Sequence, residues 1–573
     1  MNIKLVASDL YNRANGNLAR TAVVFPNKRA ALFFNEYLAK EAGKPIWSPA
    51  YITISELFRS MSTLEVADPI KLVCELYKVY RQTTNSEESL DNFYFWGELL
   101  ISDFDDADKN LARTKDLFSN LKELKSLMGD LSYMDKEQEE AIQQFFHNFS
   151  IERRTVLKER FISLWDVLGD IYTRFKENLK QQGIAYEGML YREVIETLNT
   201  DALPYETYVF VGFNVLNQVE RTLFLKLQEA GKAIFYWDYD EFYLNAKHHE
   251  AGEFIKRNMK DFPSPLPVSL FRNLDAPKEI RYIASPTENA QARYLPQWIR
   301  ENLTEPEKET AVVLCNESLL QPVLHSLPQE VKHVNITMGF PLSQTPVFSY
   351  LSTLLDLQIQ GYQPKTGRFS FQEVIAVLKH PYTRQQTTEA ESLEKELTEN
   401  NRFYPLPGEL QQDEFLTHLF TPVNSNLALT EYLGKSLQQI AGVYQQTPKT
   451  DAFDQLYRES LFKAYTTINR FHTLIEEGDL DVQAETCRRL LTKVLTSTNI
   501  PFHGEPAIGM QIMGVLETRN LDFRNLVLLS VNEGQLPKNG GDASFIPYNL
   551  RKAFGMTTID HKISVYAYYF YRL

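Results

Sequence analysis

The amino-acid sequence predicts an α/β protein with two parallel β-sheets, each interrupted by a large helical insertion. Short apolar runs rich in branched side chains occur in two groups along the chain, as the buried strands of parallel sheets do. These runs are Thr21–Phe25, Tyr208–Phe213, Ala233–Trp237, Ile280–Ala284, Thr310–Leu314, Met510–Leu516 and Leu526–Val531. The stretches 68–200 and 347–500 carry apolar residues at helical spacing. We therefore expect each sheet to be assembled from segments on both sides of a helical stretch.

The first sheet is expected to begin with a helix over residues 1–20, followed by the strand Thr21–Phe25 and a turn into another helix. Asn27, Lys28 and Arg29 would then lie at a helix N-terminus. Free backbone N–H groups and cations at such a place suit an anion.

The same sheet is expected to continue in the order that parallel strands require. Tyr51–Ser55 is a short extended run, with Ser55 as the expected N-cap of the following helix. Tyr208–Phe213, a helix over about 218–230 and Ala233–Trp237 then form a strand, a helix and a strand.

The second sheet is expected to start at Ile280–Ala284 and Thr310–Leu314, with a helix over Glu288–Ile299 between them. The chain returns to this sheet with Met510–Leu516 and Leu526–Val531, joined by a charged turn. This turn would lie at a strand edge, where open α/β sheets bind ligands.

Length and composition indicate a large folded protein. At 573 residues the chain exceeds what one hydrophobic core serves, so about three or four domains are expected. Hydrophobic residues make up 43% and aromatic residues 12%, which excludes a disordered chain. Cys74, Cys315 and Cys487 are too few and too far apart for a disulfide framework or a thiol metal site. The sequence shows no signal peptide or long apolar span, so a cytoplasmic protein is expected.

The net charge of -14 argues against a surface coated with phosphate-binding residues, although a local basic groove is compatible with it. The best local candidate is a group of cations around the aromatic-bearing segment Phe161–Phe175. It comprises Arg153, Arg154, Lys158, Arg160, Arg174, Lys176 and Lys180. Glutamates are interleaved with these cations, so a solvated helix face is the alternative.

Two segments resemble motifs of the UvrD-like superfamily 1 helicases. Phe25-Pro-Asn-Lys-Arg-Ala30 is similar to motif Ia, which touches single-stranded DNA in that family. Gln511–Pro537 resembles motif V, with Arg519 at the position of its Lys and Leu521-Asp-Phe523 at that of its Leu-Glu-Phe. Asn532-Glu-Gly534, followed by Pro537, matches the end of the motif unchanged.

The second segment also departs from the family's pattern. Gly514 stands in place of Thr, Leu516 in place of His, and Asn520 in place of Gly. The resemblance therefore implies that polar groups which couple nucleotide to DNA in the family are partly lost here.

The resemblance implies a superfamily 1 architecture, in which two RecA-like parallel-sheet domains each carry a helical insertion. The implied boundaries are 1–67 and 201–270 for domain 1A, 68–200 for insertion 1B, 275–346 and 502–573 for domain 2A, and 347–501 for insertion 2B. Both RecA-like domains would be discontinuous in sequence.

The residues of an ATP site are missing from the sequence. A P-loop needs Gly-x-x-x-x-Gly-Lys-Ser/Thr after a strand, because its backbone N–H groups wrap the phosphates, and the chain lacks this pattern. Val211-Gly-Phe213 stands where an active helicase of the family has the Asp-Glu pair that holds Mg²⁺. We therefore expect no ATPase activity and no cofactor in this chain, and a working ATPase would need a P-loop upstream of Met1.

Within the superfamily, the chain resembles the AddB-like branch of helicase-nucleases, in which a degenerate helicase core precedes a PD-(D/E)xK nuclease. The phrases that carry this resemblance are Ala185–Arg192, Asn335–Gly339, Lys379–Tyr382 and Ser544–Pro547. The resemblance implies that the chain is a fragment, with the nuclease and its Mg²⁺ expected after Leu573. Glu123-Leu-Lys125 has the Glu-x-Lys form but lies in a helical run, so no nuclease site is expected within the chain.

The leading hypothesis is a non-hydrolytic DNA-binding module of an AddB-type helicase-nuclease in double-strand break repair and recombination. Its partners would be single-stranded DNA and an AddA-like subunit. The candidate DNA contacts are Asn27, Lys28, Arg29, Arg519, Asn520, His380 and Tyr382. The last two are candidates for base stacking, and core packing is the alternative for Tyr382. The alternative function is a scaffold that holds a partner motor and nuclease without touching DNA, which the net charge favours.

Overall fold

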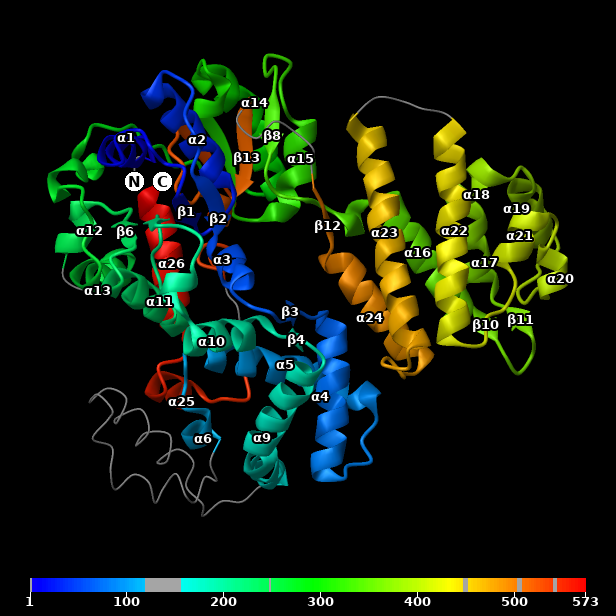
Figure 1. Ribbon diagram of the computed structural model, residues 1–573. Coiled ribbons are helices and arrows are strands. Elements are labelled where there is room, and N and C mark those ends of the chain that lie inside the picture. The colour runs from blue at the N-terminus through cyan, green and yellow to red at the C-terminus, as the bar shows by residue number, and fades with distance from the viewer. Residues whose placement is uncertain (1–2, 119–155, 247–248, 447–451, 502–507, 539–543) are drawn as a thin grey trace. The chain divides into compact units, whose positions relative to one another are not determined.

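The chain forms two compact units, shown in Figure 1. The computed structural model describes residues 3–118, 156–246, 249–446, 452–501, 508–538 and 544–573. Unit 1 comprises 1–86, 95–338 and 504–573, and unit 2 comprises 87–94 and 339–503. Both parallel sheets belong to unit 1, whereas the predicted insertion 347–501 lies within unit 2.

The first sheet has four parallel strands in the order β2-β1-β5-β6. The strands are β1 (Thr21–Phe25), β2 (Ala50–Thr53), β5 (Thr207–Val211) and β6 (Ala233–Tyr236). Every side chain of β1 is buried, as expected for an inner strand of a parallel sheet. The helices beside these strands are α1 (Ile3–Arg13), α2 (Arg29–Ala42), α3 (Ile54–Ser60) and α11 (Gln218–Glu229).

Capping boxes fix the start of two of these helices. The Thr53 hydroxyl accepts the backbone N–H of Glu56, and the Glu56 carboxylate accepts that of Thr53. The prediction of Ser55 as the N-cap of α3 is therefore wrong, because this reciprocal pair starts the helix at Ile54. Asn217 and Glu220 form the equivalent pair at the start of α11.

The second sheet has four parallel strands in the order β14-β7-β13-β8, which confirms the predicted α/β class with two parallel sheets. The strands are β7 (Thr310–Leu314), β8 (Val334–Ile336), β13 (Met510–Gly514) and β14 (Asn525–Leu529). The inner strands β7 and β13 are buried throughout. Because β13 follows β8 by more than 170 residues in sequence, the sheet is assembled from distant segments.

The predicted strand Ile280–Ala284 is wrong, because this segment has no regular secondary structure and pairs with no strand among the described residues. Its alternating apolar residues fit a strand, but the pattern does not supply a hydrogen-bonding neighbour. The helix predicted directly after it is present as α14 (Glu288–Asn302).

The rest of unit 1 is mainly helical, as the sequence predicts for much of 68–200. Its longer helices are α4 (Pro69–Thr84), α5 (Leu90–Lys109), α9 (Val156–Gln181), α10 (Glu187–Thr197), α13 (Glu253–Asp261) and α26 (Ile559–Arg572). The shorter helices are α6 (Thr114–Leu117), α12 (Glu241–Asn245), α15 (Leu320–His325) and α25 (Tyr548–Ala553). The two-residue strands β3 (Glu65–Val66) and β4 (Ile184–Ala185) pair in parallel. Residues 90–94 of α5 are grouped with unit 2.

Unit 2 is a helical assembly, in which α22 and α23 lie side by side (Figure 1). Its helices are α16 (Pro346–Asp356), α17 (Phe371–Lys379), α18 (Pro381–Gln386), α19 (Glu389–Glu399), α20 (Pro407–Leu410), α21 (Glu414–Leu419), α22 (Asn426–Gln446), α23 (Ala452–Glu476) and α24 (Ala484–Ser497). Two short antiparallel pairs complete it: β9 (Phe340–Pro341) with β12 (Asn499–Ile500), and β10 (Tyr362–Gln363) with β11 (Arg368–Phe369).

Candidate nucleic-acid interface

The predicted site residues of unit 1 lie at the carboxyl ends of the two parallel sheets, where ligands bind in open α/β sheets. Asn27–Arg29 follow β1, and the turn Val515–Asn520 follows β13. Gly212, directly after β5, lies so close to the Asn520 amide that a Cβ at this glycine would collide with it. The carboxyl edges of the two sheets therefore contact each other.

Asn27 and Lys28 are both engaged at the start of α2. Oδ1 of Asn27 accepts the backbone N–H of Ala30 at 3.2 Å, so Asn27 caps the first turn. The Lys28 ammonium lies 2.5 Å from the Glu56 carboxylate, and its side chain is 78% exposed. This ammonium is the main reason that the pKa of Glu56 is lowered. Lys28 is thus a solvent-exposed cation held at a helix start.

Arg29 points into the contact between the sheets. Its Nη1 is buried and has no hydrogen-bond partner among the described residues. Burial lowers the pKa of Arg29 to about 10, and the carboxylate of Glu517 opposes this shift. Burial also raises the pKa of Glu517, and the charge of Glu317 adds to the increase. Arg29 therefore lies near the carboxylate of Glu517 from the second sheet, and no close ion pair joins the two among the described residues.

Arg519 and Asn520 occupy the turn after β13, but neither is a freely exposed side chain. The Arg519 guanidinium lies over the Tyr569 ring at 5.0 Å, and burial lowers its pKa. Asn520 is fully buried with a φ of 64°. Both polar atoms of its amide lack a hydrogen-bond partner within the described part of the chain. Direct contact between Asn520 and DNA would require this turn to rearrange.

Arg572, which the sequence analysis did not select, joins the two sheets through α26. Its guanidinium binds Asp238 after β6 at 2.8 Å and Asp522 in the turn after β13 at 2.6 Å. Arg572 and Asp238 are both almost completely buried. The only signal in the sequence was the position of Arg572 at the end of an aromatic-rich run, which does not identify its partners.

Glu220, another residue that the sequence analysis missed, lies near the same contact. Burial raises the pKa of Glu220 to about 7, and Arg519 and Lys109 partly offset this effect. Its carboxylate accepts the backbone N–H of Asn217 at 3.1 Å. Glu220 therefore combines a structural capping role with a titration near neutral pH.

His380 and Tyr382, the candidate stacking residues of unit 2, are both buried. Nδ1 of His380 accepts the backbone N–H of Tyr382, and its Nε2 lies 2.9 Å from the Ser349 hydroxyl. Burial lowers the pKa of His380 to about 4. Tyr382 packs edge-on against Tyr350. The alternative of core packing therefore describes Tyr382, and neither ring presents a face to solvent.

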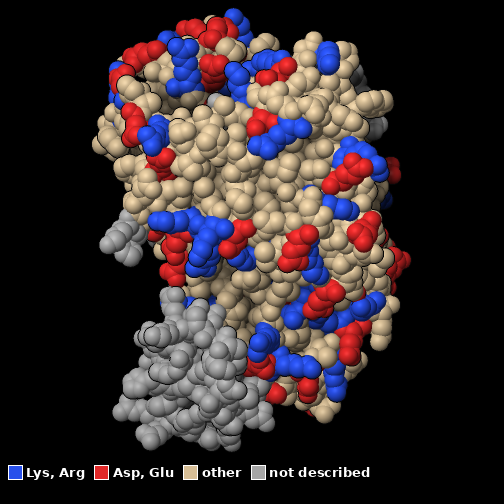
Figure 2. Space-filling model, turned by 60° about the vertical axis from the view of Figure 1, so that its left-hand side comes forward, with Lys and Arg blue, Asp and Glu red and all other residues tan. Residues whose placement is uncertain are grey.

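The predicted basic group around Phe161–Phe175 is only partly described. Arg153 and Arg154 lie outside the described residues, as do the side chains of Lys158 and Arg160. Lys176 binds the buried carboxylate of Asp108 at 2.9 Å, and Lys180 pairs with Glu193 at 2.6 Å. On the face seen in Figure 2, cations and anions are interspersed. Lys180 is exposed and fits the alternative of a solvated helix face, whereas Lys176 binds a buried carboxylate and fits neither description.

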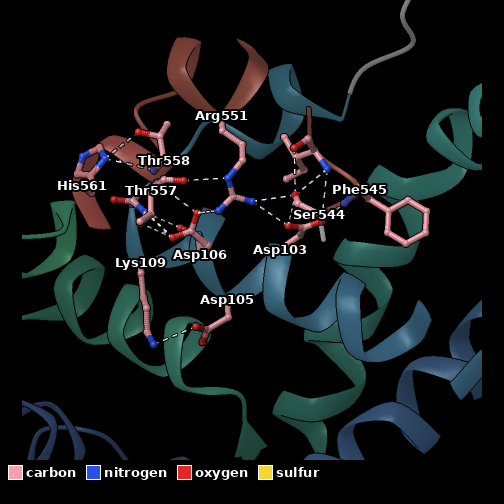
Figure 3. Close-up of polar contacts among 12 residues, drawn as sticks. Asp103, Asp105, Asp106, Lys109, Ser544, Phe545, Arg551, Thr557, Thr558 and His561 are labelled. Carbon is pink, nitrogen blue, oxygen red and sulfur yellow. Dashed lines mark hydrogen bonds and ion pairs between the residues drawn. The ribbon is translucent and has the colours of Figure 1, made fainter. Parts of the chain in front are cut away.

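A second polar cluster connects α5 with the segment Ser544–Thr558, as Figure 3 shows. The Asp103 carboxylate accepts hydrogen bonds from the Ser544 hydroxyl at 2.6 Å and the Phe545 backbone at 2.7 Å. Arg551 lies between the carboxylates of Asp103 and Asp106 and pairs with both. Ser544 is the first residue of Ser544–Pro547, one of the sequence segments named in the sequence analysis. This segment therefore has a structural role, because it holds the chain against α5.

Asp108, one turn further along α5, is fully buried and receives hydrogen bonds or ion pairs from four side chains. The donors are Tyr172 at 2.5 Å, Tyr186 at 2.6 Å, Lys176 at 2.9 Å and Arg192 at 3.1 Å. Tyr186 and Arg192 belong to another singled-out phrase, Ala185–Arg192. The carboxylates of α5 therefore organise the helical part of unit 1.

Fold and site together define an α/β protein with two parallel sheets, compatible with RecA-like domains, whose carboxyl edges contact each other. Comparison with models of known protein families and with curated proteins found no match for this chain. Among the described residues, no group of His, Cys, Asp and Glu side chains is arranged to hold a metal ion. None of the described helices has the length and apolar character needed to cross a membrane.

Proposed function

We propose that the chain is a non-hydrolytic, helicase-like module that binds single-stranded DNA within an AddB-type helicase-nuclease of double-strand break repair and recombination. One observation carries the proposal: the two segments that resemble helicase motifs, Phe25–Ala30 and Gln511–Pro537, bring their polar turns to the same pair of sheet edges. They lie almost 500 residues apart in sequence, so their meeting at one place supports a shared site.

The contact between Gly212 and Asn520 supports the non-hydrolytic part of the proposal. A metal-dependent NTPase needs a carboxylate near the end of this strand to hold Mg²⁺. Gly212 supplies no side chain there, and the Asn520 amide packs directly against it.

Lys28 is the residue that we expect to meet a DNA phosphate first. It is exposed, it lies at the start of α2, and its pair with Glu56 is open to solvent. Such a surface pair contributes about 0–1 kcal/mol, so a phosphate can replace Glu56 at small cost. Asn27 would add a polar contact from the same turn. Arg29 and Arg519 are half-buried, and they would help to hold the two sheet edges in position.

A second candidate function is a scaffold for a motor and nuclease such as an AddA-like subunit, without DNA contact. The burial of Asn520, His380 and Tyr382 favours it, as does the net charge of -14. The two functions differ in whether Lys28 contacts a phosphate, which a binding experiment tests directly.

The test is a titration of the chain with a fluorescent oligothymidylate of about 20 nucleotides, followed by anisotropy over a series of salt concentrations. Lys28→Ala should lower the affinity and reduce the salt slope by about 0.7, the value for one lost phosphate contact on a single strand. Lys40→Ala is the matched control. Lys40 lies on α2, pairs with Glu36 of the same helix, and is 66% exposed, which is close to the exposure of Lys28. No binding at low salt, or equal behaviour of the two variants, would favour the scaffold.

A further inference from the structure

Helix α26 follows the second sheet in sequence but packs against the region that follows the first sheet. The Tyr571 ring lies edge-on to the His249 ring, with 4.5 Å between their centroids. The His561 and Phe254 rings pack with 4.8 Å between their centroids. His249 and Phe254 belong to the part of unit 1 after β6. Helix α26 is therefore placed to connect the two sheets.

Arg572, at the end of α26, binds one carboxylate from each sheet. Its Nε lies 2.8 Å from Oδ2 of Asp238, which follows β6, and its Nη2 lies 2.6 Å from Oδ1 of Asp522, in the connection from β13 to β14. The Arg572 and Asp238 side chains are 4% and 1% exposed. A planar guanidinium holds carboxylates in a defined geometry, and salt screens a buried charge only weakly. Arg572 therefore fixes the position of one sheet relative to the other at this point.

A second ion pair joins the sheets at helix α2. The Lys308 ammonium lies 2.6 and 2.8 Å from the two carboxylate oxygens of Glu36. Lys308 lies in the short 3-10 helix η5 (Glu307–Glu309), directly before β7, whereas Glu36 lies on α2 beside the first sheet. The two side chains are 25% and 26% exposed. Two turns earlier on the same face of α2, Arg29 lies near Glu517 of the second sheet. Helix α2 therefore meets the second sheet at two points.

These ion pairs take the place of a ligand at the contact between the sheets. Two domains that meet edge to edge commonly close around a ligand and open when it leaves. Here the chain's own cations bind the carboxylates of both sheets. Opening would break the Lys308 pair and one of the two pairs of Arg572. We propose that Lys308 and Arg572 clamp the two sheets in one fixed arrangement, so that their contact stays closed without a ligand and does not respond to a nucleotide.

Hydrogen exchange of the whole chain measures how often this contact opens. The reporters are the backbone amides of residues 212–214, after β5, and 520–521, after β13, which are buried where Gly212 and Asn520 meet. Lys308→Gln should make both groups of amides exchange at least about threefold faster, because the contact opens more often. The amides of the inner strand β1 are the internal reference and should keep their rates, since the sheet itself stays folded.

Lys40→Gln is the matched control, because Lys40 binds the same Glu36 carboxylate at 2.7 Å but does so from within α2. It should leave the exchange of both groups of reporters unchanged. Equal rates for the Lys40 and Lys308 variants would overturn the clamp.

Asp522→Asn tests the other half of the clamp without disturbing a buried charge. Asp522 is 54% exposed, and the buried pair of Arg572 with Asp238 stays in place in this variant. The reporters at 212–214, which are far from Asp522 in sequence, should again exchange at least about threefold faster. If Lys308→Gln also accelerates the exchange of β1, this second variant decides, and unchanged rates in it would overturn the proposal.

Mg²⁺ with ATP, added to the unsubstituted chain, tests whether the contact responds to a nucleotide. Both groups of reporters should keep their exchange rates. Slower or faster exchange in the presence of Mg²⁺ and ATP would overturn the fixed arrangement. This outcome is independent of the proposed function, because the measurement contains no DNA.

Discussion

Two buried polar regions of unit 1 differ in how completely their groups are bonded. Around α5, the carboxylates of Asp103, Asp106 and Asp108 each accept several hydrogen bonds or ion pairs. Where the two sheets meet, Asn520 and Arg29 bury polar atoms that have no partner among the described residues. Buried polar groups in folded proteins are nearly always bonded, and the exceptions call for an explanation such as a functional role. The comparison separates groups whose hydrogen bonds and ion pairs hold the fold from groups that have no partner among the described residues.

The largest expected loss of stability comes from removing a buried carboxylate of α5. Asp108→Ala would leave the charges of Lys176 and Arg192 without their buried partner and remove two tyrosine hydrogen bonds. We expect the free energy of unfolding to fall by about 3–5 kcal/mol, measured by urea denaturation. Glu206→Ala is the control, because its pair with Arg20 is exposed and should contribute no more than about 1 kcal/mol. Similar losses for both variants would mean that the α5 carboxylates are not structural.

The contact between the sheets should lose less stability than the α5 region when a buried polar group is removed. Gly212→Ala places a Cβ against Asn520 on a backbone with a φ of 71°, and should cost about 1–3 kcal/mol. Asn520→Ala should cost about 1 kcal/mol, because it removes a buried amide that has no described partner and its main penalty is an Ala at a φ of 64°. In the double variant the collision disappears, so the two effects should fail to add by about 1 kcal/mol. Additive effects in urea denaturation would show that the two residues do not contact each other.

Local sequence patterns predicted the strands of these sheets because each buried strand is a short apolar run with clear ends. Thr21–Phe25 and Thr310–Leu314 appear as strands with the predicted bounds. Ile280–Ala284 has the same kind of pattern, but pairing depends on a neighbour that the segment itself does not encode.

The site was less predictable, because burial and pairing are properties of the folded chain. The sequence placed Lys28 and Asn520 in turns at the right sheet edges, but it gave no indication that one is exposed and the other buried. Arg572 and Glu220 were missed, because their partners lie far away in sequence or on a neighbouring helix. Whether Lys28 and Arg519 contact DNA stays a prediction.

Measuring the free energy of unfolding as a function of pH should detect the buried carboxyl group of Glu220, which lies near the contact between the sheets. Burial raises the pKa of Glu220 to about 7 from an ordinary value of 4.5, so the folded chain keeps a proton that the unfolded chain has released. The free energy of unfolding therefore falls as the pH rises between these two values. Between about pH 5 and about pH 8, the original chain should lose about 1–2 kcal/mol more than Glu220→Gln does. Glu229→Gln, at an exposed position of α11, is the control and should follow the original chain.

The smallest effect concerns Glu56, which holds the ammonium of Lys28 at 2.5 Å and also caps α3. Glu56→Gln removes the charge while keeping a side-chain oxygen for the Thr53 N–H, so α3 should stay intact. Under the proposed function, the released Lys28 binds single-stranded DNA about two- to threefold more tightly, because one competing charge is lost. The same change combined with Lys28→Ala should give no gain. A gain that persists without Lys28 would show that Glu56 repels DNA directly, and would remove Lys28 from the proposed contact.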